Sequence, residues 1–164
     1  MTVKKYGATK LLPEQLEQIR LGERAGVDVD WYADSSFSWE QMQEIRAALE
    51  EGIDVSDFAS NKFDCNQMHQ IRLGKRSGVD VKLYADPKYD FLQMYEIRLG
   101  LEDGLGERVT WYANPDLDWT QMEQLRLGIK EGVDARVYAS PKIRWQYMQA
   151  IRHDLVKSSD NRKG

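Results

Sequence analysis

Arginine has the most regular spacing of any chemically active residue in this chain. One arginine recurs at an interval close to 26 residues, at Arg20, Arg46, Arg72, Arg98, Arg126 and Arg152. Such a ladder could follow a phosphate backbone, because each guanidinium presents a bidentate fork. A helical projection instead places Arg46 about 20° from Trp39 and about 40° from Met42, inside an apolar stripe. We therefore expect a buried structural ladder. An unpaired buried charge is costly, and the recurring aspartates are the expected partners: Asp28, Asp54, Asp80 and Asp134.

Methionine, cysteine and histidine occur in patterns that favour packing over catalysis. One methionine per repeat could form a soft-metal face, but its position in the apolar register predicts core packing. Cys65 shares its repeat position with aromatic residues, which predicts a core residue and not a nucleophile. His69 and His153 occupy different repeat positions, and no nucleophile lies at motif spacing from either. These side chains predict neither a catalytic site nor a metal site.

No cofactor fingerprint is present in the sequence. Gly104-Leu105-Gly106 lacks the third glycine and the preceding strand of a dinucleotide-binding motif. No pair of ligands has zinc-site spacing. We expect a protein that is not an enzyme and that carries no cofactor.

The arginine spacing belongs to a tandem array of six units of about 26 residues. The predicted repeats are residues 11–36, 37–62, 63–88, 89–116, 117–142 and 143–156, with a half repeat at 3–10. Residues 1–156 are expected to form a single helical repeat domain, followed by a flexible tail at 157–164. Two extra residues at 105–108 interrupt the period between the fourth and fifth units.

Each unit has the signals of a long helix followed by a short one. Ser38, Asp64, Asp90 and Asp118 each precede a glutamine by three residues, the spacing of a capping box. A recurrent glycine at the end of the long helix suits the left-handed conformation, and the aspartate after it can cap a short helix that closes at an aromatic-small pair such as Tyr32-Ala33. A single unit cannot bury its apolar stripe, so the units must stack. The predicted fold class is all-α, an α-solenoid.

Glycine also recurs inside the long helix, at Gly22, Gly74, Gly100 and Gly128. Glycine there costs roughly 0.5–1 kcal/mol relative to alanine. Its recurrence predicts close approach by a neighbouring element.

Composition limits the compartment and the partners. The formal net charge is −4 with a pI near 5.3, which gives no global attraction to nucleic acid or anionic lipid. No apolar run is long enough to span a bilayer, and residues 1–6 lack the apolar region of a signal peptide. One cysteine excludes an internal disulfide and fits a reducing compartment. We expect a cytoplasmic protein without a membrane partner.

The repeated unit Gln-Met-x-x-Ile-Arg-x-Gly-Leu-Glu-x-Gly-Val-Asp-Val-x-x-Tyr-Ala-x-Pro resembles a short helical repeat of gut Firmicutes and mobile-element proteins. The likeness covers residues 3–156. It implies the six Met/Leu-x-x-Ile/Leu-Arg cores and the glycine turns, and it implies no enzymatic activity. A mobile-element context further implies inhibition of a host defence nuclease, as anti-CRISPR proteins do.

Residues that vary between units are the candidates for partner binding. Tryptophan and arginine are enriched in interface hot spots, and the third unit is locally basic. The candidate partner-binding residues are Trp31, His69, Lys75, Arg76, Lys82, Lys88, Tyr95 and Trp111. Two hypotheses remain open: a non-enzymatic scaffold that binds a protein partner, and a repeat protein that binds nucleic acid through the basic surface of the third repeat.

Overall fold

Helices make up the regular secondary structure of the protein. The computed structural model describes residues 10–161. The six α-helices are α1 (Pro13–Ala25), α2 (Trp39–Glu50), α3 (Cys65–Ser77), α4 (Phe91–Glu102), α5 (Trp119–Lys130) and α6 (Trp145–Asp160). The 3-10 helices are η1 (Val29–Trp31), η2 (Val81–Leu83), η3 (Gly106–Trp111) and η4 (Ala135–Tyr138). Residues 10–161 contain no strand, which confirms the predicted all-α class.

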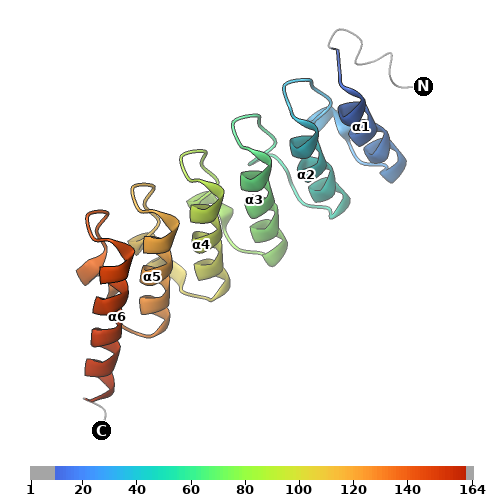
Figure 1. Ribbon diagram of the computed structural model, residues 1–164. Coiled ribbons are helices and arrows are strands. Elements are labelled where there is room, and N and C mark those ends of the chain that lie inside the picture. The colour runs from blue at the N-terminus through green and yellow to red at the C-terminus, as the bar shows by residue number, and fades with distance from the viewer. Residues whose placement is uncertain (1–9, 162–164) are drawn as a thin grey trace. The chain divides into compact units, whose positions relative to one another are not determined.

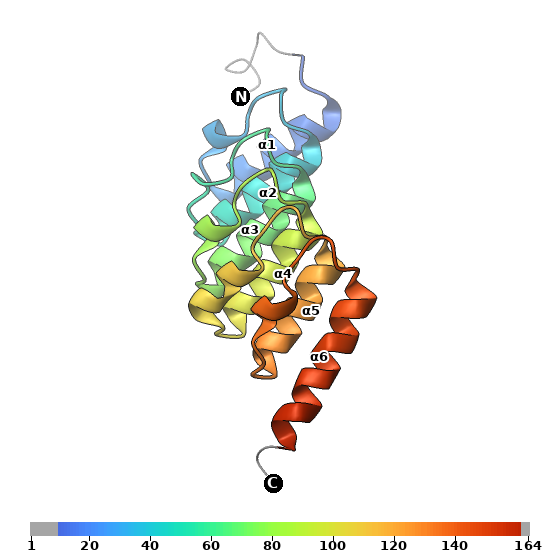
Figure 2. The same ribbon diagram turned by 90° about the vertical axis from the view of Figure 1, so that its left-hand side faces the viewer.

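The chain divides into two compact units, unit 1 over residues 1–76 and unit 2 over residues 77–164. Within each unit, consecutive long helices lie side by side and run in the same direction (Figure 1). Helix α1 packs on α2, α4 packs on α5, and α5 packs on α6. Seen from the side, the short connecting segments lie on one side of the long helices (Figure 2). Both η3 and η4 contact the long helix before them and the one after, so each short helix joins two long ones.

Two predicted boundary features fall near the ends of the described chain. The half repeat at 3–10, with Tyr6-Gly7, lies outside the described residues apart from Lys10. Helix α6 continues to Asp160, into the segment predicted as a flexible tail.

The core is built from the methionine and aliphatic positions of each long helix. The methionines of α2 to α6 have no exposed surface: Met42, Met68, Met94, Met122 and Met148. The aliphatic residue three positions later is equally buried in α2 to α5: Ile45, Ile71, Ile97 and Leu125. These positions confirm that the methionine stripe packs, as its register predicts.

Capping boxes begin the long helices as predicted. In α2, α4 and α5 the N-cap side chain accepts from the N–H of the glutamine, and the glutamine Oε1 accepts from the N-cap N–H. The same glutamine has a second role that its spacing does not indicate. Gln121 Nε2 donates to the carbonyl of Ile143 at 2.7 Å, and Gln41 Nε2 donates to the carbonyl of Phe63 at 2.6 Å. One side chain therefore caps its own helix and holds the loop that leads into the next one.

A tyrosine hydroxyl explains the glycine inside the long helix. A Cβ on Gly128 would lie 1.9 Å from Tyr138 Oη, and a Cβ on Gly100 would lie 1.8 Å from Tyr112 Oη. Tyr138 Oη donates to the carbonyl of Gln124 at 3.2 Å, which holds the hydroxyl against the helix. The second repeat has neither the glycine nor the hydroxyl, because Ala48 replaces the glycine and Phe58 replaces the tyrosine. The predicted close approach is confirmed, and the approaching group is the phenol.

The two-residue insertion is absorbed by a longer 3-10 helix. Leu105 N–H donates to the carbonyl of Gly100 at 3.0 Å, as Val133 N–H does to that of Gly128 at 3.0 Å. Helix η3 then spans six residues, and Tyr112 Oη still reaches the carbonyl of Glu96 at 3.2 Å. The register of the following unit is therefore preserved.

The short helices follow the predicted aspartates with one exception. Asp28, Asp80 and Asp134 cap η1, η2 and η4. After Asp54 the chain forms a turn instead, closed by the bond from Phe58 N–H to the carbonyl of Val55 at 3.0 Å.

Candidate functional site

The arginine ladder is buried and is occupied by contacts within the protein. The side chains of five arginines are only 7–16% exposed: Arg46, Arg72, Arg98, Arg126 and Arg152. Arg20 differs, with a side chain that is 55% exposed and a loose contact to Glu17 at 3.7 Å. The structural interpretation is confirmed for the five, and the inclusion of Arg20 in a buried ladder was wrong.

The expected partners of the ladder were also wrong. Asp28, Asp80 and Asp134 accept from backbone N–H groups at the start of the short helices, and Asp54 accepts from Ser56 N–H. The arginine Nε instead donates to a side chain of the preceding long helix. The pairs are Arg46 with Gln18 at 3.1 Å, Arg72 with Glu44 at 2.9 Å, Arg126 with Glu96 at 2.7 Å and Arg152 with Gln124 at 3.2 Å. Asp28, Asp80 and Asp134 are unsuited because each already satisfies an orphan donor of a short helix, and Asp54 is occupied by Ser56.

The side chains that accept from the arginine Nε are glutamates in two pairs and neutral glutamines in the other two. The positive charge of each arginine is therefore compensated in different ways. Glu96 is 2% exposed, and burial raises its pKa, although the hydrogen bond from Arg126 opposes the shift. Arg126 Nη1 also lies 3.5 Å from Asp103. Arg152, whose Nε meets the neutral Gln124, has its Nη1 2.5 Å from Glu131. Arg46, whose Nε meets the neutral Gln18, has its Nη1 2.5 Å from Glu50, so every arginine of these pairs has at least one carboxylate partner.

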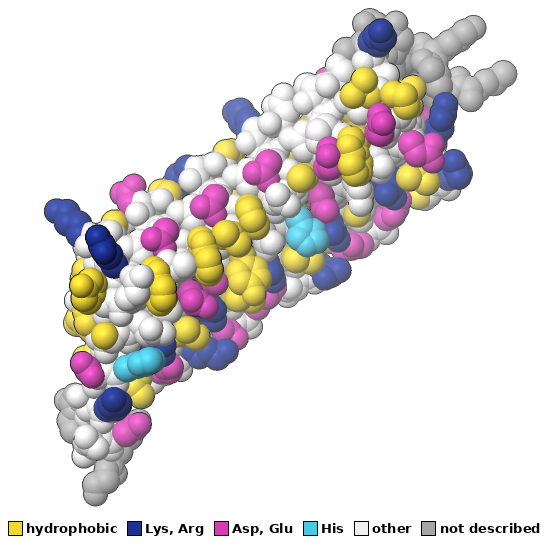
Figure 3. Space-filling view, in the orientation of Figure 1, with side chains coloured by type: hydrophobic (Ala, Val, Ile, Leu, Met, Phe, Trp, Pro, Cys, Tyr) yellow, Lys and Arg dark blue, Asp and Glu magenta, His cyan; other side chains and the backbone are white. Residues whose placement is uncertain are grey.

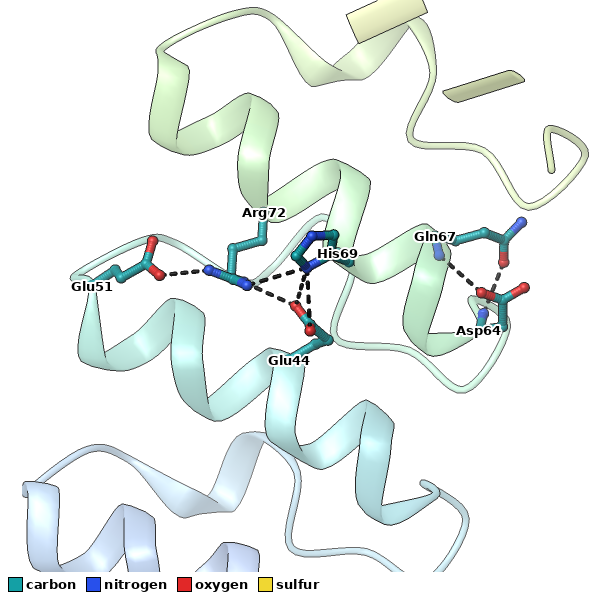
Figure 4. A network of polar contacts seen from close by, with 6 residues as sticks. All are labelled: Glu44, Glu51, Asp64, Gln67, His69 and Arg72. Atoms are coloured by element: carbon teal, nitrogen blue, oxygen red, sulfur yellow. Dashed lines mark hydrogen bonds and ion pairs between the residues drawn. The ribbon is translucent and has the colours of Figure 1, made fainter. Parts of the chain in front are cut away.

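His69 belongs to the same network of contacts between α2 and α3. Its Nδ1 lies 3.2 Å from Glu44 Oε2 and 3.2 Å from Arg72 Nη2 (Figure 4). Arg72 Nη1 reaches back to Glu51 at 2.5 Å. No serine, threonine or cysteine takes part in this network as the figure draws it. The arrangement can hold α3 against α2, and it contains no nucleophile for a general base to activate.

The predicted basic surface of the third repeat is divided between the two units. Lys75 and Arg76 belong to unit 1, and Lys82 and Lys88 belong to unit 2. The Lys75 ammonium forms an ion pair with Asp57, and its side chain is only 14% exposed. Lys88 pairs with Asp86 at 3.0 Å and lies over the Tyr89 ring. Arg76 and Lys82 are exposed.

The predicted aromatic contacts lie in different environments. Trp31 is 41% exposed in unit 1, and Tyr95 is 38% exposed in unit 2. Trp111 is half-buried, because the Arg136 guanidinium stacks over its ring at 4.5 Å. Asp134 holds Arg136 with two hydrogen bonds of 2.8 Å. Trp111 therefore takes part in packing between consecutive short helices.

An aromatic position predicted for the core is exposed instead. The first residue of four long helices is 37–39% exposed: Trp39, Phe91, Trp119 and Trp145. Cys65, in the same position of α3, is half-buried, and burial raises the pKa of its thiol. The core assignment was wrong because the first residue of each helix lies about one turn before the buried methionine, at the end of the helix, where the side chain is only partly covered.

Unit 2 carries three of these residues on consecutive helices, and we name Phe91, Trp119 and Trp145 the aromatic row. Tyr95 on α4 and Tyr147 on α6, which is 65% exposed, add to the same helices. Hydrophobic side chains are interspersed with acidic ones on the face that carries the long helices (Figure 3). Sequence reasoning missed the row. The sequence did contain a signal for it, because each of these residues directly follows an N-cap position, where helix capping does not require a large aromatic side chain.

Metal and membrane features are absent from the described part of the chain. Among residues 10–161, no group of three or more histidine, cysteine, aspartate or glutamate side chains could hold a metal ion. No helix in this range is long and apolar enough to cross a membrane.

Comparison with protein-family models, with curated proteins and with solved structures finds no match. The all-α fold with helices packed in sequence agrees with a helical repeat. The resemblance to the repeat of gut Firmicutes and mobile-element proteins stays a prediction.

Proposed function

We propose that this protein is a non-enzymatic repeat scaffold, an α-solenoid that binds a protein partner through the aromatic row of unit 2. One observation carries the proposal: Phe91, Trp119 and Trp145 remain more than one third exposed on three consecutive helices. Tryptophan is the residue most enriched in interface hot spots, where exclusion of water from a large ring contributes most of the binding energy. The methionines of the same helices, in contrast, have no exposed surface.

The distribution of charge supports a protein partner over a nucleic acid. Asp90 and Asp118 directly precede two members of the row, and both are exposed. Their carboxylates would repel phosphates. The buried arginines are engaged by neighbouring helices, and Lys75 and Lys88 each form an ion pair. Within residues 10–161, the buried arginines, Lys75 and Lys88 are therefore occupied by contacts inside the chain and do not form a row of cations open to phosphates.

The test is affinity capture from a host lysate with Trp119→Ala, with the retained material treated with nuclease. We expect a nuclease-resistant protein to be retained by the wild-type chain and to bind the variant at least tenfold more weakly, since a central tryptophan contributes about 2 kcal/mol or more. Val137→Ala is the matched control, because Val137 is apolar and 66% exposed in the same unit but lies outside the row. Circular dichroism establishes that both variants stay helical.

Two results would oppose the proposal. Equal retention by wild type and the Trp119→Ala variant would remove the row from the interface. Loss of all retained material on nuclease treatment would favour the nucleic-acid hypothesis instead.

A further inference from the structure

A hollow of about 410 Å³ lies between the start of α5 and the start of α6. These helices start at their upper ends in Figure 1. It is open to solvent, and its volume lies within the range of ligand-binding clefts. Its lining comprises Asp116, Asp118, Gln121, Pro141, Arg144, Trp145 and Gln146. The hollow therefore combines an exposed indole with charges of both signs.

Two of the lining charges have no partner within residues 10–161. The Asp116 carboxylate forms no hydrogen bond or ion pair there, although its backbone N–H donates to Asn114. The Arg144 guanidinium likewise contacts no carboxylate in the described chain. Asp118 is different, because its oxygen accepts from Gln121 N–H at 2.9 Å and from the Thr120 hydroxyl. One free anion and one free cation thus face the same hollow without pairing with each other.

Arg144 stands where the repeat has a capping residue. The other capped long helices have Ser38, Asp64, Asp90 or Asp118 at this position, and each accepts a backbone hydrogen bond. Arg144 makes no side-chain cap bond. Arginine at an N-cap forgoes a stabilising contact, and departures from a local rule concentrate at functional sites.

The equivalent position of the preceding repeat has its charges satisfied internally. Lys88 replaces Asp116 there, and it pairs with Asp86 and lies over the Tyr89 ring. Asp118 replaces Arg144 and caps α5. The unpaired charges are therefore particular to the hollow before α6 and are not a property of every repeat.

We infer that this hollow binds a short segment of the partner protein that carries one basic and one acidic side chain. The basic side chain pairs with Asp116, the acidic one pairs with Arg144, and the segment between them packs on the Trp145 indole. The inference rests on the proposed function, because Trp145 is a member of the aromatic row. Beyond the proposed function, it specifies the charges of the partner segment that is recognised.

The test uses two blocked peptides, acetyl-Arg-Ala-Glu-amide and its uncharged counterpart acetyl-Gln-Ala-Gln-amide, with the full chain. The readout is the indole N–H resonance of Trp145, which the Trp145→Phe variant assigns. We expect the charged peptide alone to shift this resonance in a saturable and salt-sensitive way. Asp116→Asn and Arg144→Gln should each weaken binding about two- to fivefold, the range of a partly exposed ion pair. Asp160→Asn and Lys157→Gln, matched charge changes outside the lining of the hollow, should leave it unchanged.

The inference is overturned if neither peptide shifts the resonance, if both shift it equally, or if the control variants weaken binding as much. Its failure is distinguishable from failure of the proposed function. Loss of partner retention by Trp119→Ala without a peptide response at Trp145 would keep the protein-binding role and remove only the hollow. Retention that is insensitive to Trp119→Ala would remove the row itself.

Discussion

At Gly128 the Tyr138 hydroxyl occupies the space that any Cβ would need. The hydroxyl stays there because it donates to the Gln124 carbonyl at 3.2 Å. In the second repeat, Phe58 has no hydroxyl, and alanine is accommodated at position 48 in place of the glycine. A glycine that lowers helix stability is thus retained to make room for one oxygen atom of the following short helix.

We predict that Gly128→Ala destabilises the protein by about 1–3 kcal/mol, the cost of overpacking a well-filled core. The helix propensity of alanine alone would stabilise the chain by up to about 1 kcal/mol, so the sign of the change is informative. Denaturant unfolding measures it. The double variant Gly128→Ala/Tyr138→Phe should recover most of the loss, because the phenyl ring lacks the clashing oxygen. Recovery that is no better than additive would show that another contact causes the clash.

Burial makes the ladder arginines structural. We predict that Arg126→Ala lowers the free energy of unfolding by about 3–5 kcal/mol, because Glu96 would be left buried without its partner. Arg20→Ala is the matched control in the same repeat position. The Arg20 side chain is 55% exposed, and its loss should cost under about 1 kcal/mol. Equal losses in the two variants, measured by denaturant unfolding, would contradict the role assigned to the Arg126–Glu96 pair.

The long helices begin with a capping box, except for α1 and α6. Helices α2, α4 and α5 have full capping boxes. Helix α1 keeps the glutamine bond but has Leu12 at the cap, and α6 has Arg144 with Tyr147 in place of the glutamine. The two-residue insertion in the fourth unit changes the length of a helix and not its cap. Helix η3 is longer than the other short helices, and the hydrogen bond from the Tyr112 hydroxyl to the Glu96 carbonyl is kept.

We predict that Arg144→Asp raises the free energy of unfolding by about 0.5–2 kcal/mol, the usual contribution of an N-cap. The aspartate would accept from an orphan N–H of the first turn, as Asp118 does in α5. Removal of an existing cap by Asp118→Ala should lower the free energy of unfolding by a similar amount. A destabilised Arg144→Asp variant, observed by thermal or denaturant unfolding, would show that Arg144 has a structural contact that outweighs the missing cap.

On the scale of the whole molecule, two compact units each consist of long helices joined through short segments. Three tyrosine side chains of unit 2 are at most 1% exposed: Tyr84, Tyr112 and Tyr138. Burial raises the pKa of Tyr138 to about 12 and raises those of Tyr84 and Tyr112 as well. Ionisation of these groups is therefore linked to the stability of the unit.

We predict that stability is constant with respect to these tyrosines below pH 10 and falls as the pH rises from about 10 to about 12. The unfolded chain releases the phenol protons near pH 10, whereas the folded chain retains them, so unfolding becomes more favourable with rising pH. Denaturant unfolding across this range measures the slope, and absorbance of tyrosinate reports ionisation. Tyr138→Phe should reduce the slope. An unchanged slope would mean that Tyr138 ionises without unfolding.

The sequence alone was sufficient for the features that depend on neighbours close in the chain. The capping boxes and the glycine turns follow from residues within about one turn of each other, whose hydrogen bonds are local. The 26-residue period follows from the recurrence of the same residues along the chain, and the all-α class follows from the helix signals in each unit. The buried methionine and aliphatic positions also follow, because helical periodicity determines which residues share a face.

Only the tertiary structure decided which groups meet across elements. Arg126 pairs with Glu96, 30 positions earlier, and not with the aspartates that the spacing suggested. Similarly, the aromatic row is exposed although its periodicity coincides with that of the core. The partner of a long side chain and the cover over the first residue of a helix both depend on how consecutive helices and loops are offset. Periodicity specifies the direction of a side chain from its own helix, and the position of the neighbouring element determines what that side chain contacts.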